Sequence, residues 1–336
     1  MAEAQPTTQQ HVQTTFEGDG FVQQITEQGY AEMPHYISED QIAAAVEAYA
    51  RFTQSYPDPD PSTMRAMLPG NLEVDGATGE CKQLDELDRS RDEQLEWHKY
   101  RTNTAGIGKP DGYTNRSFQV SALQRAEGLV LVDDPKEYFH YTRGWLAAVN
   151  RSHNEFGWGA VPPEVAVLET RFRDIHQKSA ELIIRIAGLI EETHPEIRSF
   201  FTQESLASSP IRLLFYHPTA TQQESLAAGH YDKGAFTLQL AESHQGLRIA
   251  ANDKALEPVI RTSDLAAGFP ARNLRETVGQ DTPYQPSWHD VTRTDIPNHG
   301  RSIPSSAADR CARWALIFFA NGDSFRNPDK ALTHTR

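Results

Sequence analysis

The chain has 336 residues, of which 38% are hydrophobic and 23% are charged, a balance typical of a folded protein rather than a disordered one. Its formal net charge of −14 at pH 7 repels polyanions, so we expect neither nucleic acid nor membrane as a partner. The only cysteines, Cys81 and Cys311, lie far apart in the sequence, which argues against a disulfide framework or a structural zinc site.

The N-terminal residues 1–15 are polar, and we expect them to form a disordered tail. They lack the basic and apolar regions of a signal peptide, and no apolar run in the chain is long enough to cross a bilayer. A cytoplasmic location is therefore the expectation.

A strand at residues 30–33 and a helix follow the tail. Ser38 and Gln41 have the S-x-x-Q spacing of a capping box, which predicts that the helix begins there. Apolar side chains then recur at helical spacing: Ile42, Val46 and Tyr49.

The middle of the chain contains a loop-rich region and a long helix. Residues 56–115 are rich in Pro, Gly, Asp and Lys, which indicates loops that could act as a lid. A helix is predicted over 164–192, because apolar residues recur there at steps of three and four. Its core-facing stripe consists of Leu168, Phe172, Ile175, Leu182, Ile186 and Leu189.

Short β-rich runs dominate the chain after Ser209. They read "IRLLFYH", "AFTLQL", "GLRIA" and "RWALIFFA" and are separated by turn residues. This pattern predicts an antiparallel sandwich or barrel.

A His and an Asp open one of these runs, "GHYDKGAFTLQL". Because side chains alternate along a strand, His230 and Asp232 are expected to face the same side. Such a pair can be a solvated pair at a turn, or it can supply two ligands of the two-His, one-carboxylate set that holds non-haem Fe(II). Alone, the pair is a weak signal.

A third ligand has to come from another strand, and four downstream histidines are candidates: His244, His289, His299 and His334. His289 lies among aromatic and β-branched residues in "YQPSWHDV", which suits a strand. The surroundings of the other three suit a turn, a loop and the chain terminus. These considerations favour His289 over His299 without excluding the latter.

An ordered series of motifs resembles the isopenicillin N synthase-like branch of the iron(II)/2-oxoglutarate-dependent dioxygenases. From the second half, the motifs are "IRLLFYHP", "GHYDKGAFTLQL", "QGLRI", "GFPARNLRETVGQDTPYQPSWHDV" and "RWALIFFAN". From the first half, "QGYAEMPHYISEDQIAAAVEAYARF" and "DDPKEYFHYT" resemble the family's opening segments. The resemblance spans roughly residues 18–325 and is weakest in the loops of 56–115.

The resemblance implies a mainly β protein with flanking helices around a double-stranded β-helix, or jelly-roll, core. It implies that the iron ligands are His230, Asp232 and His289. It further implies that Arg313 binds the distal carboxylate of 2-oxoglutarate, assisted by Tyr216, and that Fe(II), 2-oxoglutarate and O2 take part. In domain terms, we expect a helical and strand region with lid loops over 16–207 and the jelly-roll core over 208–336, acting as one catalytic unit.

Three departures from the family pattern bear on the cosubstrate. Ala315 replaces a serine that would contact 2-oxoglutarate, and Leu214 replaces a polar residue. The segment 291–312 is longer than usual, so it could form a flap over the site, and it keeps His299 open as a ligand.

The function implied by the resemblance is oxidation of a small organic molecule, most simply hydroxylation, coupled to decarboxylation of 2-oxoglutarate to succinate. The alternatives are an iron oxidase of the same fold that uses no 2-oxoglutarate, and a jelly-roll binding protein without catalysis. Tyr100, Arg101 and Tyr113 could line the substrate site, although a solvated loop suits each of them better.

Overall fold

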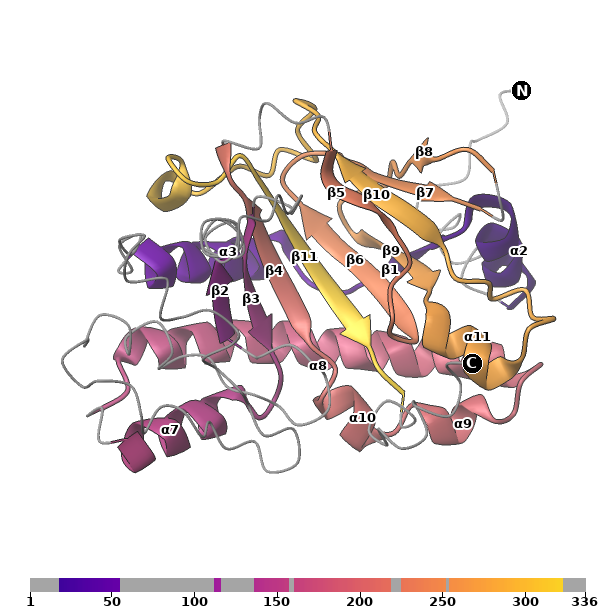
Figure 1. Ribbon diagram of the computed structural model, residues 1–336, viewed down its shortest axis with the longest axis horizontal. Coiled ribbons are helices and arrows are strands. Elements are labelled where there is room, and N and C mark those ends of the chain that lie inside the picture. The colour runs from indigo at the N-terminus through magenta and orange to yellow at the C-terminus, as the bar shows by residue number, and fades with distance from the viewer. Residues whose placement is uncertain are drawn as a thin grey trace, which may run out of the picture.

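Two antiparallel sheets that face each other form the centre of the protein (Figure 1). The computed structural model describes residues 18–54, 112–115, 136–156, 160–218, 225–251 and 254–322. The larger sheet has the strand order β1-β9-β6-β11-β4-β3-β2, and the smaller sheet has the order β5-β10-β7-β8. The predicted tail at 1–15 lies outside the described residues.

The described part of the chain contains eleven strands. The larger sheet contains β1 (Ala31–Pro34), β2 (Gly112–Asn115), β3 (Lys136–Tyr141), β4 (Ile211–Tyr216), β6 (Phe236–Glu242), β9 (Leu265–Pro270) and β11 (Arg313–Ala320). The smaller sheet contains β5 (Ser225–His230), β7 (Leu247–Ala250), β8 (Glu257–Pro258) and β10 (Trp288–Thr292).

Helices are interspersed with the strands along the chain, and several of them share a core with one face of the larger sheet. They are α2 (Gly18–Gln28), α3 (Glu39–Gln54), α7 (Trp145–Phe156), α8 (Pro163–Glu191), α9 (Ile197–Phe200), α10 (Gln203–Ala207), α11 (Arg272–Val278) and the short 3-10 helix η4 (Ser305–Ala307). The long helix α8 runs along the larger sheet (Figure 1). None of the helices in the described residues combines the length and the apolar character that a membrane crossing requires.

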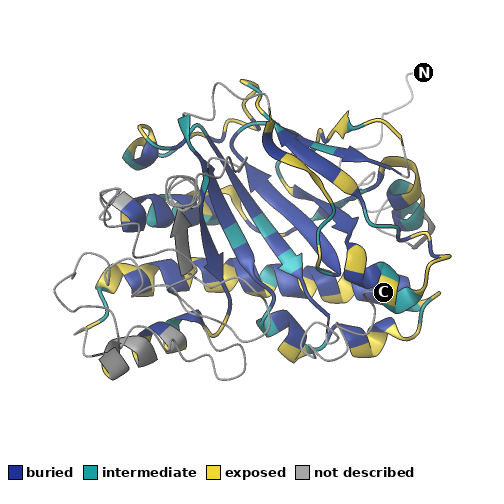
Figure 2. Cartoon of the chain, viewed as in Figure 1, coloured by how far each residue is buried: buried dark blue, intermediate teal, exposed yellow. Residues whose placement is uncertain are grey.

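The two faces of the larger sheet have different partners, as the side chains of β4 show. Leu213 and Phe215 belong to the core shared with the helices, whereas Leu214 and Tyr216 belong to the core shared with the smaller sheet. This follows from the alternation of side chains along a strand. Because the larger sheet is covered on both sides, β6 and β9 are buried along their whole length (Figure 2).

Most of the predicted elements are confirmed. Helix α3 begins with the expected capping box, in which the Gln41 amide donates to Ser38 Oγ at 3.2 Å and the Ser38 amide donates to Gln41 Oε1 at 3.2 Å. Helix α8 buries the predicted stripe except for Leu189, which is only partly buried. Phe172 is fully buried, and its ring centroid lies 5.0 Å from that of Phe139. The mainly β, jelly-roll fold with flanking helices is confirmed.

Helix α2 and strand β2 are among the elements that were not foreseen. Helix α2 buries Phe21 and Ile25, four residues apart, but the "GDG" at its start is typical of a turn. Strand β2 occupies the last four residues of the region that was expected to be loop, where it pairs with β3. Strands β1 and β3 come from the N-terminal half and join the larger sheet by pairing with β9 and β4.

Candidate metal centre

Strands β5 and β10 bring two histidines together at one end of the smaller sheet. His230 ends β5 and lies directly opposite His289 of β10 in the antiparallel register, with the ring centroids 4.3 Å apart. Asp232 follows β5 by two residues. The ligand atoms of His230, Asp232 and His289 all lie within 4.8 Å of one another.

The carboxylate of Asp232 lies between the two imidazoles. Its Oδ1 is 3.7 Å from His230 Nε2, and its Oδ2 is 3.7 Å from His289 Nε2. Two nitrogens and a carboxylate oxygen converging in this way match the donor set that Fe(II) takes in non-haem oxygenases. His299, the alternative ligand, lies elsewhere, with its Nε2 against the Arg261 carbonyl.

Backbone carbonyls fix the orientation of both rings. His230 Nδ1 donates to the Ala228 carbonyl at 2.8 Å, and His289 Nδ1 donates to the Ser287 carbonyl at 3.0 Å. A carbonyl can only accept, so each Nδ1 carries the proton and each Nε2 presents its lone pair towards Asp232. Burial, followed by the charge of the neighbouring His289, lowers the pKa of His230, which favours the neutral form that binds metals.

Asp232 is itself held by a hydroxyl from the larger sheet. Thr237 of β6, which is buried, donates its hydroxyl to Asp232 Oδ2 at 2.6 Å. The backbone carbonyl of Asp232 also accepts from the Arg272 amide at the start of α11. A carboxylate supported in this way keeps its position.

The segment 291–312, which could form a flap over the site, lies at its Arg313 end, where Arg293, Thr294 and Asp295 line the cavity beside Arg313. Further along the segment, Pro297 forms an isolated bridge with His244, and the Asn298 amide donates to the Ser243 carbonyl. Arg301 anchors the segment to Glu39 of α3 through an ion pair of 2.5 Å. The reason is that β10 runs away from His289 and delivers the segment at the far end of the sheet.

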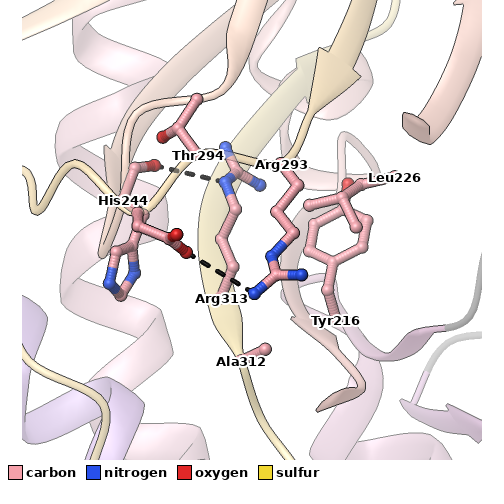
Figure 3. A pocket seen from close by; sticks show the side chains of 8 residues that line it. Tyr216, Leu226, His244, Arg293, Thr294, Ala312 and Arg313 are labelled. Atoms are coloured by element: carbon pink, nitrogen blue, oxygen red, sulfur yellow. Dashed lines mark hydrogen bonds and ion pairs between the residues drawn. The ribbon is translucent and has the colours of Figure 1, made fainter. Parts of the chain in front are cut away.

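Arg313 and Tyr216 lie opposite each other in the register of β11 and β4, and the guanidinium carbon lies 5.2 Å from the centroid of the tyrosine ring. Both line a small cavity of about 60 Å³ (Figure 3). Leu226, His244, Arg293, Thr294, Asp295 and Ala312 complete the lining. In Figure 3 the dashed lines join Arg313 to the His244 carbonyl and Arg293 to Asp295.

Glu242 is a site residue that the sequence analysis did not identify. It is fully buried, and its Oε2 accepts from Arg313 Nη2 at 2.5 Å. Its other neighbours are also donors: Gln239 Nε2 at 3.2 Å, Asn298 Nδ2 at 3.2 Å and Arg261 Nη2 at 3.6 Å. The buried carboxylate is thus surrounded by four nitrogen donor groups, two of which belong to arginines.

A β-bulge directs Glu242 into the barrel. The pairing of β6 with β11 shifts register, so that Ala315 lies opposite Glu242 while Ile317 lies opposite Gln239. Without the extra residue, Glu242 and Gln239 would face opposite sides of the sheet, because they are three positions apart. Ala315 faces the same side as Glu242, since residues directly opposite each other share a face.

No protein-family model and no curated protein sequence matches the chain. Solved structures do match it. A 2OG-Fe(II) oxygenase family protein from Caulobacter crescentus matches with a TM-score of 0.56 at 15% identity, over 96% of this chain and 88% of that one. Neurospora crassa T7H in complex with alpha-KG and 5-formyluracil matches with a TM-score of 0.53 at 13% identity, over 94% and 81%.

A third match is the 2-oxoglutarate complex of dioxygenase for auxin oxidation 1 from Arabidopsis thaliana, with a TM-score of 0.50 at 14% identity, over 91% of this chain and 87% of that one. The chain therefore has the double-stranded β-helix fold of the Fe(II)/2-oxoglutarate oxygenases. Within that fold it carries a His-Asp-His cluster whose donor atoms converge.

Proposed function

We propose that this protein is a non-haem Fe(II) oxygenase that couples decarboxylation of 2-oxoglutarate to succinate with oxidation, most simply hydroxylation, of a small organic molecule. The observation that carries this proposal is the convergence of His230, Asp232 and His289, with both Nε2 atoms directed at one carboxylate. The fold supports it, because related oxygenases have the same architecture.

The residues present fit an Fe(II) ion. His230 and His289 would bind it through Nε2 and Asp232 through a carboxylate oxygen, leaving positions for O2 and an organic cosubstrate. When bound, the iron would supply the activation of O2 that an unreactive C–H bond requires. The protein holds the ligands in place through the two backbone carbonyls and the Thr237 hydroxyl.

The residues present also fit a carboxylate at Arg313. Among the described residues, Arg313 Nη1 has no hydrogen-bond partner although it is buried. Arg261 and Arg313 are both buried and have Glu242 between them, which leaves one positive charge in excess within this group. A buried guanidinium is stable only when it is compensated, so the distal carboxylate of 2-oxoglutarate would supply the missing charge and Tyr216 would lie beside it.

Succinate formation tests the proposal and separates it from an oxidase that uses no 2-oxoglutarate. Purified protein loaded with Fe(II) should convert 2-oxoglutarate slowly to succinate when O2 is admitted, even without its substrate. Asp232→Ala should abolish this turnover. If the loaded wild type forms no succinate with any of a varied panel of small molecules, the oxidase alternative is favoured.

Anaerobic titration with Fe(II) tests the second alternative, a binding protein without catalysis. The wild type should bind one Fe(II), and Asp232→Ala should bind it at least tenfold more weakly, since a charged ligand is lost. Equally weak binding by both would favour the non-catalytic protein.

The proposal extends to the substrate class, the location and the domain organisation. T7H has been solved with thymine and with 5-formyluracil, and we propose a small organic substrate for this chain as well. We further propose a cytoplasmic location and a single catalytic unit formed by 16–207 and 208–336. Of the suggested lining residues, Tyr100 and Arg101 lie outside the described residues, and Tyr113 lies in β2.

A further inference from the structure

Glu242 places a carboxylate inside a site that is itself proposed to bind the carboxylate of a ligand. It lies inside the barrel, fully buried, and takes one of the donor groups of Arg313. Arg313 Nε is occupied by the His244 carbonyl at 3.2 Å. In the described part of the chain, only Nη1 of Arg313 is left without a hydrogen-bond partner, so an incoming carboxylate has to share the guanidinium with Glu242.

Arg261 provides the second positive charge beside Glu242. Its side chain is buried, and Nη1 donates to the Leu240 and Leu265 carbonyls at 3.1 Å and 2.8 Å. Within the described residues, its Nε and Nη2 have no hydrogen-bond partner, although Nη2 lies 3.6 Å from Glu242 Oε1. Burial lowers the pKa of Arg261, and the charges of Arg301 and Arg313 lower it further, while Glu242 and Glu32 raise it.

We propose that Glu242 sets the affinity of this protein for its cosubstrate, as an internal carboxylate that competes for Arg313 with the distal carboxylate of 2-oxoglutarate. The inference rests on the proposed function. A carboxylate cannot donate to another carboxylate, so Glu242 repels the ligand and cannot replace the serine hydroxyl that Ala315 lacks. Its benefit is to the ligand-free protein, in which it compensates one of the two positive charges of Arg261 and Arg313.

This charge arrangement predicts effects of opposite sign for two variants. Glu242→Gln removes the competing negative charge and should bind 2-oxoglutarate at least tenfold more tightly, because an unscreened charge a few ångströms away acts strongly in a buried site. Arg261→Gln removes the excess positive charge and should bind it at least tenfold more weakly. General damage to the fold would weaken binding in both variants and cannot produce opposite signs.

The test is anaerobic isothermal titration of the Fe(II)-loaded protein with 2-oxoglutarate and, separately, with glutarate. Glutarate has the same distal carboxylate but no keto oxygen, so it reports the Arg313 end of the site apart from any chelation of iron. Thermal shifts of the metal-free protein with both ligands give a second readout that does not depend on activity. Metal-free Glu242→Gln should melt at a lower temperature than wild type. Either ligand should raise its melting temperature by more than it raises that of the wild type.

Glu169→Gln is the matched control. Glu169 is also a buried carboxylate with an arginine partner, at 2.8 Å from Arg173 Nη2, but it lies on α8 outside the barrel. This variant should lose stability without a change in ligand affinity.

The outcomes separate the inference from the proposed function. If the wild type binds 2-oxoglutarate and Glu242→Gln binds it equally or more weakly, the inference is overturned and the proposed function stands. If the Fe(II)-loaded wild type and Glu242→Gln both bind neither ligand, the 2-oxoglutarate proposal falls and this inference with it. Should Glu242→Gln not fold, Arg261→Gln decides: unchanged or tighter binding overturns the inference.

Discussion

Replacing Thr237 with valine tests how the protein supports its candidate metal centre. Valine has nearly the same shape, so the change removes the hydroxyl that donates to Asp232 Oδ2 at 2.6 Å and little else. Thr237 is only 2% exposed, and the short distance is typical of a hydrogen bond to an ionised acceptor. Such bonds contribute about 1.5–3 kcal/mol.

This energy converts into a measurable change in metal affinity. If it is lost only from the metal-bound state, the Kd for Fe(II) should rise by a factor of about 10 to 150. Anaerobic isothermal titration with Fe(II) measures it directly. Thr237→Ser keeps the hydroxyl and should bind nearly as tightly as the wild type.

A second valine variant controls for the loss of a buried hydroxyl as such. Thr53 is also buried, but its hydroxyl donates to the Tyr49 carbonyl in α3, at 2.9 Å and away from the site. Thr53→Val should leave Fe(II) affinity unchanged. The reasoning fails if Thr237→Val binds Fe(II) as tightly as the wild type, because Asp232 would then need no support from β6.

Three further predictions concern the cosubstrate site, the pH dependence and the packing of the barrel. Arg313→Met should weaken 2-oxoglutarate binding by about 30-fold or more, because it truncates one partner of a buried charge pair. The affinity for Fe(II) should stay unchanged. A wild-type Kd for 2-oxoglutarate in this variant would exclude Arg313 from the site. Burial lowers the pKa of His176 to about 4 from its ordinary 6.5, so the stability it contributes is fully present above pH 6.5 and is lost as the pH falls towards 4. Urea unfolding at pH 7 and pH 5 should show a loss of about 2 kcal/mol from this side chain, which should vanish in His176→Gln; an identical pH slope in both proteins would contradict it. Gly246→Ala should lower the free energy of unfolding by about 1–3 kcal/mol, because an added Cβ would lie 2.5 Å from the Thr292 carbonyl oxygen. An unchanged midpoint of urea unfolding would contradict this, since it would mean that β7 and β10 can move apart at little cost.

The strands and the metal cluster could be predicted from the sequence because both depend on local patterns. Short β-rich runs between turns define β4, β6, β7 and β11, and the His-x-Asp spacing places His230 and Asp232 on one side. The choice of His289 over His299 depended on strand-like neighbours, and the structure places His289 in β10 opposite His230. These features require no knowledge of distant contacts.

The charge arrangement around Arg313 could not be predicted in the same way. Glu242 ends a strand, where an acidic residue is ordinarily solvated, and only the bulge in β6 turns it inward. Arg261 reaches the same place from between β8 and β9, and Asn298 reaches it from the segment after β10. Three segments that are distant in sequence meet at this place. The alternation of side chains within any one strand therefore could not predict that these charges lie together.

The position of the Fe(II) ion tests the central claim most directly. Crystals grown anaerobically with Fe(II) should show one anomalous scattering peak at the iron edge, within bonding distance of His230 Nε2, His289 Nε2 and a carboxylate oxygen of Asp232. A peak elsewhere, or no peak between these three side chains at saturating Fe(II), would contradict the account.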